Sequence, residues 1–199
     1  HRGHCGDRRK TLANAKSVAA ALMSFKQEMG AYPCDRTRKI LEEKEINSLP
    51  EGDSSNAYFA QLLAAYAIDS ETAFFAPGGV VGAKEGDNIK DSPPTILAPG
   101  ENGYAYIMAP DGRSLTDTSP DTPLILAPVR DQRGGAEPRF DPDPYDGKFV
   151  YGLADGSSAT GEIDEDGHAI SKDHEPFFQT GSDSLFGNDI PVVKYPLGL

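Results

Sequence analysis

The clearest hydrophobic pattern in the chain lies near its N-terminus, over residues 8–29. Its apolar positions recur at steps of three and four residues: Leu12, Ala15, Val18, Ala19, Leu22, Phe25 and Met29. This spacing places them on one face of an α-helix. No glycine or proline interrupts the segment, and Gly30 and Pro33 follow it as helix-ending residues. We therefore predict one long amphipathic helix over residues 8–29.

Two further helices are predicted before residue 70. A weaker pattern covers residues 37–46, ahead of a turn at residues 50–52. The run AYFAQLLAAYAI over residues 57–68 is stronger, and Asn56 is expected to cap it. The buried face of this third helix is expected to contain Tyr58, Leu62, Leu63, Tyr66 and Ile68.

After about residue 70 the pattern changes to short strand-like runs between Gly, Pro and Asp clusters. Strands are predicted at residues 72–75, 103–108, 122–127 and 148–153. The last of these is followed by Asp155-Gly156 and then by residues 158–163, which predicts a β-hairpin. A second turn over residues 164–167 leads to a short strand at residues 168–170, while the polar stretch 80–94 is predicted to be a loop.

Helices followed by antiparallel strands predict an α+β fold, in which the long helix packs on a small antiparallel sheet with long loops. A chain of 199 residues is long enough for one domain with a core. Within a domain spanning residues 8–199, we expect a helical spine at 8–30, a helical region at 31–70, and the sheet with its loops at 71–199. Residues 1–7 are expected to be disordered or left from cloning.

The net charge is −12, which argues against nucleic acid as a partner, because phosphate binding needs clustered Lys and Arg. The first ten residues are the exception. Four basic residues against Asp7 give them +3, so the remainder of the chain carries −15. The basic residues Arg2, Arg8, Arg9 and Lys10 are either solvated, or lie next to a membrane segment or an acidic neighbouring subunit.

The sequence contains no apolar run near the roughly 20 residues that span a bilayer. It has no signal peptide and does not begin with Met, so we interpret it as a fragment of a longer protein. Cys5 and Cys34 flank the predicted helix, which would be about 33 Å long. Because a disulfide needs Cα atoms within about 7 Å, we expect free thiols or a bridge between chains.

Two segments carry a resemblance to a known family. The helix and its end, KSVAAALMSFKQEMGAYP at residues 16–33, resemble the second half of the long N-terminal helix of type II secretion pseudopilins. The segment DPDPYDGKFVY at residues 141–151 looks like a variant of the family's DPWGxPYxY segment, which begins its sheet. Residues 56–78, 100–108 and 122–128 are similar to longer, verrucomicrobial-type pseudopilins, so the resemblance covers most of the chain. The family's hydrophobic half-helix and the Trp of DPWG are absent.

The resemblance implies a structural subunit of a type II secretion or type IV pilus-like filament, and not an enzyme. Its head would lie in the periplasm or outside the cell, anchored to the inner membrane through an N-terminal helix that this chain lacks. Its partners would be other pseudopilin subunits and secretion-system components. Arg8, Arg9 and Lys10 would then pair with acidic patches on neighbouring subunits.

Calcium is the best chemical candidate for a ligand. Asp141, Asp143 and Asp146 precede Gly147, which partly matches the start of a calcium-binding loop. Two prolines interrupt that pattern, and the glutamate at its twelfth position is missing. The resemblance implies a different calcium site in the C-terminal loop 181–190, where candidate ligands are Asp183 and Asp189, although aspartates that merely form turns explain the same residues.

The four histidines are weaker metal candidates. His1 and His4 lie close to Cys5, but a polar remnant at the chain end is the simpler interpretation. His168 and His174 are expected to be solvated in an acidic region. We therefore assign no residue to a catalytic, cofactor or metal site.

Two alternative functions stay open. One is a polysaccharide-binding surface or filament-tip protein that uses exposed aromatic side chains: Tyr104, Tyr106, Phe177 and Phe178. The other is an exported hydrolase, which would need clustered buried acids in a cleft. No G-x-S-x-G, S-x-x-K or H-E-x-x-H motif and no phosphate-binding loop occurs in the sequence.

Overall fold

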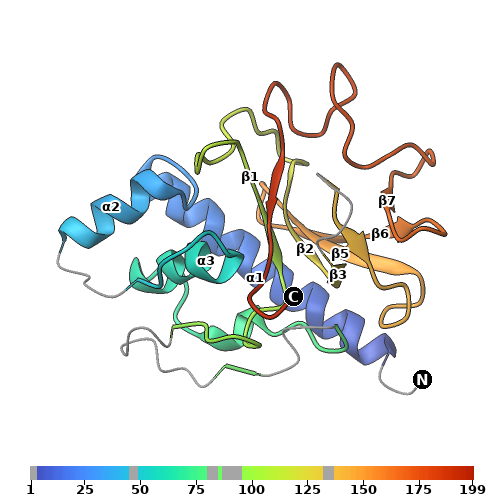
Figure 1. Cartoon of the computed structure of the whole chain (residues 1–199), viewed down its shortest axis with the longest axis horizontal. Helices are drawn as coiled ribbons and strands as arrows, with labels where there is room; N and C mark the ends of the chain where they lie inside the picture. Colours follow the sequence, from blue (N-terminus) through green and yellow to red (C-terminus); the bar gives the residue numbers. More distant parts are fainter. Residues whose placement is uncertain (1–3, 45–48, 80–84, 87–95, 132–136) are drawn as a thin grey trace.

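The computed structural model describes residues 4–44, 49–79, 85–86, 96–131 and 137–199. Its long N-terminal helix packs against a six-stranded antiparallel sheet, which confirms the predicted α+β fold (Figure 1). Apart from residues 85–86, the loop predicted at residues 80–94 lies outside the described residues.

Helix α1 (His4–Met29) is the long helix that the apolar pattern predicts, but it begins four residues earlier. Residues 4–7 are therefore helical and not part of a disordered N-terminus. The helix ends at Gly30, whose N–H donates to the carbonyl of Lys26 and whose φ of 82° turns the chain out of the helix. Figure 1 shows α1 running obliquely across the molecule to the side where α2 lies.

The second and third helices differ in detail from the prediction. Helix α2 (Asp35–Glu43) starts at Cys34, which is buried with a free thiol. The side chain of Cys5 is outside the description. Helix α3 (Ser55–Ala64) is capped by Ser54, whose side chain accepts the N–H of Ala57.

Asn56 is therefore not the cap of α3, contrary to the prediction. It is fully buried, and its amide donates to the carbonyl of Leu97 at 2.8 Å. The predicted buried face also extended too far, because Tyr66 lies beyond the helix with a φ of 58° and is 74% exposed. The Asn56 side chain thus bonds to a distant loop, and Ser54 caps the start of the helix.

The predicted strand at residues 72–75 is wrong. Residues Glu71–Phe74 form a short 3-10 helix, η1, whose cap Ser70 accepts the N–H of Thr72. Such local hydroxyl-to-backbone bonds offer the chain an alternative to strand pairing.

The main sheet has the strand order β7-β6-β5-β2-β1-β8. The predicted strands are confirmed as β1 (Ala105–Met108), β2 (Pro123–Ala127), β5 (Lys148–Leu153), β6 (Ser158–Ile163) and β7 (Ala169–Ile170). The prediction missed β8 (Val192–Lys194), which pairs with β1 at the sheet edge, and the small pair β3 (Val129–Asp131) and β4 (Arg139–Phe140).

The predicted hairpin between β5 and β6 forms, and only the glycine of its Asp-Gly pair takes positive φ. Gly156 has a φ of 85° and donates its N–H to the carbonyl of Leu153. The turn that follows β6 repeats this arrangement, with Gly167 at a φ of 86° donating to Asp164.

Helix α1 packs mainly on β5, with further contacts to β6 and β2. The approach is close, because a Cβ at Gly152 would lie 2.8 Å from Ile125 Cγ1 and 3.2 Å from the carbonyl oxygen of Ala15. The absence of a side chain at Gly152 therefore permits this helix-to-sheet distance. The apolar stripe of α1 is buried at Ala15, Val18, Ala19, Leu22 and Phe25.

Hydroxyl groups add a second set of contacts between α1 and the rest of the domain. Tyr104 donates to the carbonyl of Thr11, and Ser158 donates to the carbonyl of Leu12, each at 2.7 Å. The hydroxyls of Thr11 and Tyr145 share a hydrogen bond of 2.6 Å. These directional bonds fix where along α1 the sheet sits, which apolar packing alone does not.

Candidate functional site

The aromatic residues named for polysaccharide binding do not form an exposed surface, so the prediction that their side chains are exposed is wrong. Tyr104 and Tyr106 are 0% and 1% exposed. Tyr106 donates to the carbonyl of Pro33 at 2.7 Å. Phe177 is also buried, and Phe178 is half-buried and stacks on Phe186.

Burial raises the pKa of both Tyr104 and Tyr106 well above the ordinary tyrosine value, because a phenolate is poorly solvated there. Tyr106 lies on β1 and Tyr104 directly precedes this strand. All four positions of β1 are buried, since it is an inner strand between β2 and β8 and both faces of the sheet are covered there. Tyr104 and Tyr106 are therefore core residues.

The first calcium candidate does not assemble a ligand set. Asp141 accepts the N–H of Asp143 at 3.0 Å, which is a local turn contact. Asp143 and Asp146 are exposed, and among the described residues the three carboxylates do not converge. The segment forms the turn that leads into β5.

In the second calcium candidate, Asp189 connects two loops. Its carboxylate accepts the N–H groups of Thr116 and Asp117, both at 2.8 Å. Asp117 in turn accepts the N–H of Asn188 at 2.7 Å, while Asp183 is exposed. This reciprocal pair of aspartates holds the C-terminal loop against the loop before β2, using oxygens that a calcium ion would need.

One histidine does lie among potential metal ligands. Within the described part of the chain, a single group of three ligand atoms comes within 4.8 Å of one another, from Asp164, Asp166 and His168. Imidazole with carboxylates suits Zn²⁺ or a related cation. However, one Asp164 oxygen already accepts the N–H groups of Asp166 and His168, each at 2.9 Å. The turn alone therefore accounts for much of this grouping.

The surroundings of this group are acidic. His168 Nδ1 lies 3.8 Å from the second oxygen of Asp164. The pKa of Glu137 is raised overall, mainly by burial. Nearby His168 lowers this pKa and Asp164 raises it. His174 is exposed, as expected, His1 lies outside the described residues, and only the backbone of His4 is described.

Acids also line a hollow beside β7, which is the nearest approach to a hydrolase cleft. Asp173, Glu175 and Asp183 contribute to its wall together with Phe177. All three acids are exposed, whereas the predicted catalytic arrangement requires buried ones.

The first turns of α1 form an exposed basic surface. Arg9, Lys10 and Lys16 are exposed, and Arg8 is half-buried. None of the four forms an ion pair with a residue that the structure describes. This uncompensated charge is the property expected of a surface that meets an acidic neighbour.

A second basic surface lies near the other end of α1, and sequence reasoning missed it. Arg36 and Lys39 on α2 join Arg113 on the loop after β1, around a cavity of about 480 Å³. Arg113 is 74 or more positions from Arg36 and Lys39 in the sequence, so no local pattern marks the three together. Their shared sign of charge was the only available signal.

Comparison with known proteins does not assign this chain to a family, since no family model, curated protein or solved structure matches it. Among the described residues, no helix combines the length and the apolar character needed to cross a membrane.

Proposed function

We propose that this chain is the head of a filament subunit of the type II secretion or type IV pilus-like class, acting through subunit packing. The observation that carries this proposal is the construction of α1. From Thr11 to Phe25 the helix buries one face on the sheet, while its first turns expose basic side chains that form no ion pair with a described residue.

This construction suits a mechanical element. Close packing at Gly152 and the hydroxyl bonds to the carbonyls of Thr11 and Leu12 join one turn of the helix to the rest of the head, and the buried apolar stripe continues this contact as far as Phe25. A load applied to one end of α1 would therefore pass into the whole head. The resemblance of residues 16–33 to pseudopilin helices supports the same function.

The proposal extends to location and partners. A hydrophobic helix upstream of α1 would anchor the subunit to the inner membrane and place the head in the periplasm or outside the cell. Neighbouring subunits would meet the basic start of α1 with acidic surfaces, for which a chain of net charge −12 has an ample supply.

The upstream coding sequence tests the class directly. We expect a prepilin peptidase site followed by about 20 apolar residues that continue into α1. A conventional cleavable signal peptide, with no retained apolar helix, would contradict the proposal.

Charge reversal tests the assembly mechanism. In the full-length protein, Arg8→Glu, Arg9→Glu and Lys10→Glu together should reduce filament yield about tenfold or more, because like charges would face each other across the contact. Filaments are measured by electron microscopy and by sedimentation. The matched control is Lys172→Glu, which reverses an exposed charge on the loop after β7 and should leave the yield unchanged. Normal yield from the triple variant would sink the electrostatic contact.

A further inference from the structure

The basic surface beside α2 has the features of a receptor for an acidic group. We call Arg36, Lys39 and Arg113, with the cavity they border, the basic groove. No ion pair joins any of the three cations to a described residue. Asp35 and Asp111 also line the cavity, so three cations and two carboxylates leave its lining with a net charge of +1. Asp35 also accepts the hydroxyl of Tyr58 at 2.8 Å.

A backbone hydrogen bond joins the two segments that carry the cations of the groove. The N–H of Asp35 donates to the carbonyl of Gly112 at 3.0 Å, which holds the start of α2 against the loop that carries Arg113. The N-terminal end of a helix carries partial positive charge. The carboxylate of Asp35 already stands in the first turn of α2, so the excess of cationic side chains is what favours an anionic occupant.

A turn rich in acidic residues lies on the same molecule. The turn between β6 and β7, residues 164–167, contains Asp164, Glu165 and Asp166; we call it the acidic turn. The side chains of Glu165 and Asp166 are exposed and pair with no cation in the described part of the chain. Arg139 approaches the turn but donates to the backbone carbonyl of Asp166.

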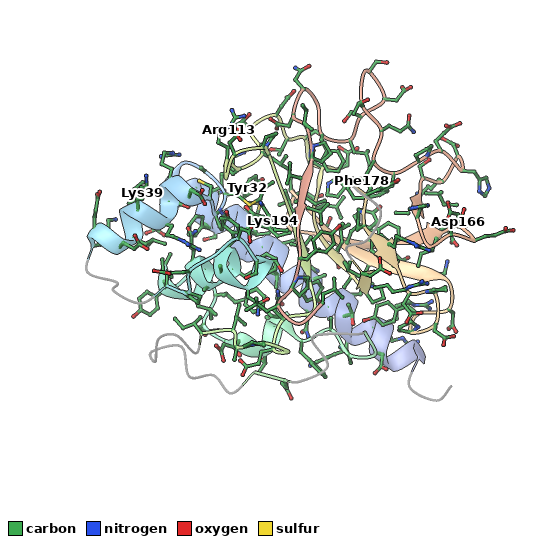
Figure 2. The ribbon with its side chains drawn as sticks, viewed as in Figure 1. Tyr32, Lys39, Arg113, Asp166, Phe178 and Lys194 are labelled. Carbon is green, nitrogen blue, oxygen red and sulfur yellow. The ribbon has the colours of Figure 1, made fainter. Side chains whose placement is uncertain are left out.

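The acidic turn is rigid and lies far from the groove. Its ends are joined by the bonds from Asp164 to His168 and from Gly167 to Asp164. Figure 2 shows Lys39 toward one end of the long axis of the molecule and Asp166 at the other end. One copy therefore cannot fill its own groove with its own turn.

We propose that the basic groove of one copy binds the acidic turn of a second copy. Because the two surfaces differ and lie at opposite ends, the contact is head-to-tail, and each added copy leaves one groove and one turn free. Repetition gives an open string of heads. This inference rests on the proposed filament function and adds to it the residues that join successive heads.

A complementary pair of variants tests the contact by sedimentation of the 199-residue chain at low ionic strength. One variant reverses the groove (Arg36→Glu, Lys39→Glu), and the other reverses the turn (Glu165→Lys, Asp166→Lys). Only exposed side chains change, and circular dichroism verifies folding. The original chain should associate as its concentration rises and dissociate in 0.5 M salt, as expected for about a 4 Å screening length.

Each variant alone should weaken association at least tenfold, and an equimolar mixture should recover it, because intact groove meets intact turn and reversed groove meets reversed turn. Undiminished association by either variant, a mixture that stays monomeric, or an original chain that stays monomeric at about 1 mM would each overturn the proposal. Saturable binding of inorganic phosphate to the groove without any self-association would overturn it in favour of a small-anion site.

The two proposals fail in different ways. Normal filaments from full-length protein that carries either reversal would remove the head-to-tail contact and leave the filament function standing. An upstream sequence without an anchor would remove the filament function, while sedimentation would still decide whether the two surfaces bind each other.

Discussion

Single hydroxyl groups join the core of this protein to α1 and to the segment that follows α1. The rings of Tyr104 and Tyr106 are buried. The first hydroxyl donates to the carbonyl of Thr11 and the second to the carbonyl of Pro33. A buried hydroxyl without a partner is unfavourable, so each tyrosine is suited to one position only. This specificity belongs to individual atoms and not to the apolar pattern.

Removal of one such hydroxyl tests this. Tyr104→Phe should lower the free energy of unfolding by about 1 kcal/mol, because the bond to the carbonyl of Thr11 is lost while the ring stays packed. Urea titration measures the change. The control is Tyr151→Phe, whose hydroxyl makes no hydrogen bond to a described residue and whose loss should change stability by less than about 0.5 kcal/mol.

The same tyrosines predict alkaline sensitivity. In the unfolded chain they ionise near pH 10, whereas burial keeps their pKa well above that value in the folded protein. The unfolded state therefore releases more protons as pH rises, so their contribution to stability is complete below about pH 10 and is lost above it. Urea unfolding between about pH 8 and pH 11 should show this loss, and a Tyr104→Phe, Tyr106→Phe double variant should show a shallower one. Stability that rises with pH over this range would contradict the burial argument.

At the level of elements, the sheet depends on one close approach of α1 and on one connection between loops. The first involves Gly152 on β5 beneath α1, and the second involves Asp189 near β8. Because β8 forms one edge of the sheet, the loop that leads into it needs support from outside the strand ladder.

Gly152→Ala tests the close approach. The added Cβ would overlap Ile125 and crowd the carbonyl of Ala15, so α1 must shift, and we expect a loss of about 1–3 kcal/mol in unfolding free energy. Thermal unfolding gives the comparison. The control is Gly6→Ala on α1, where no atom lies within 4 Å of the new Cβ. This change should be neutral or slightly stabilising.

Asp189→Ala tests the loop connection. Losing the acceptor for two N–H groups should cost about 1–2 kcal/mol and should speed hydrogen exchange in residues 181–191. Asp183→Ala removes an exposed carboxylate from the same loop and should change neither measurement. Equal effects from the two variants would show that Asp189 is not a specific connection.

At the scale of the whole molecule, the chain is acidic, but its basic side chains gather in two separate regions. Basic side chains collect at the first turns of α1 and at the groove beside α2, near the two ends of a helix about 39 Å long. Two binding regions separated by such a distance should act independently.

This separation predicts additivity in assembly. If both contacts operate in the filament, combining the reversals at residues 8–10 with those at residues 36 and 39 should reduce yield by about the product of the two separate reductions. Sedimentation of full-length filaments measures all four combinations. A double effect no larger than either single effect would mean that both sets of residues serve one contact.

Several features followed from the sequence alone because their causes are local. The period of apolar residues predicted α1, and the Asp-Gly pair predicted the β5–β6 hairpin, since periodicity and positive φ depend on neighbouring residues only. The order of helices and strands was sufficient for the α+β class. The resemblance to pseudopilins remains the basis of a proposal.

Other features were decided by tertiary structure, because their causes are residues far apart in the chain. Asn56 bonds to the carbonyl of Leu97 and does not cap its helix. Tyr104 and Tyr106 are core residues because α1 lies against the first and α3 against the second. The basic groove likewise exists only because Gly112 binds the start of α2. The local sequence pattern predicts the secondary structure of most segments. Which side chains are buried, and which charged side chains lie together, depends on the segments that become neighbours in the folded chain.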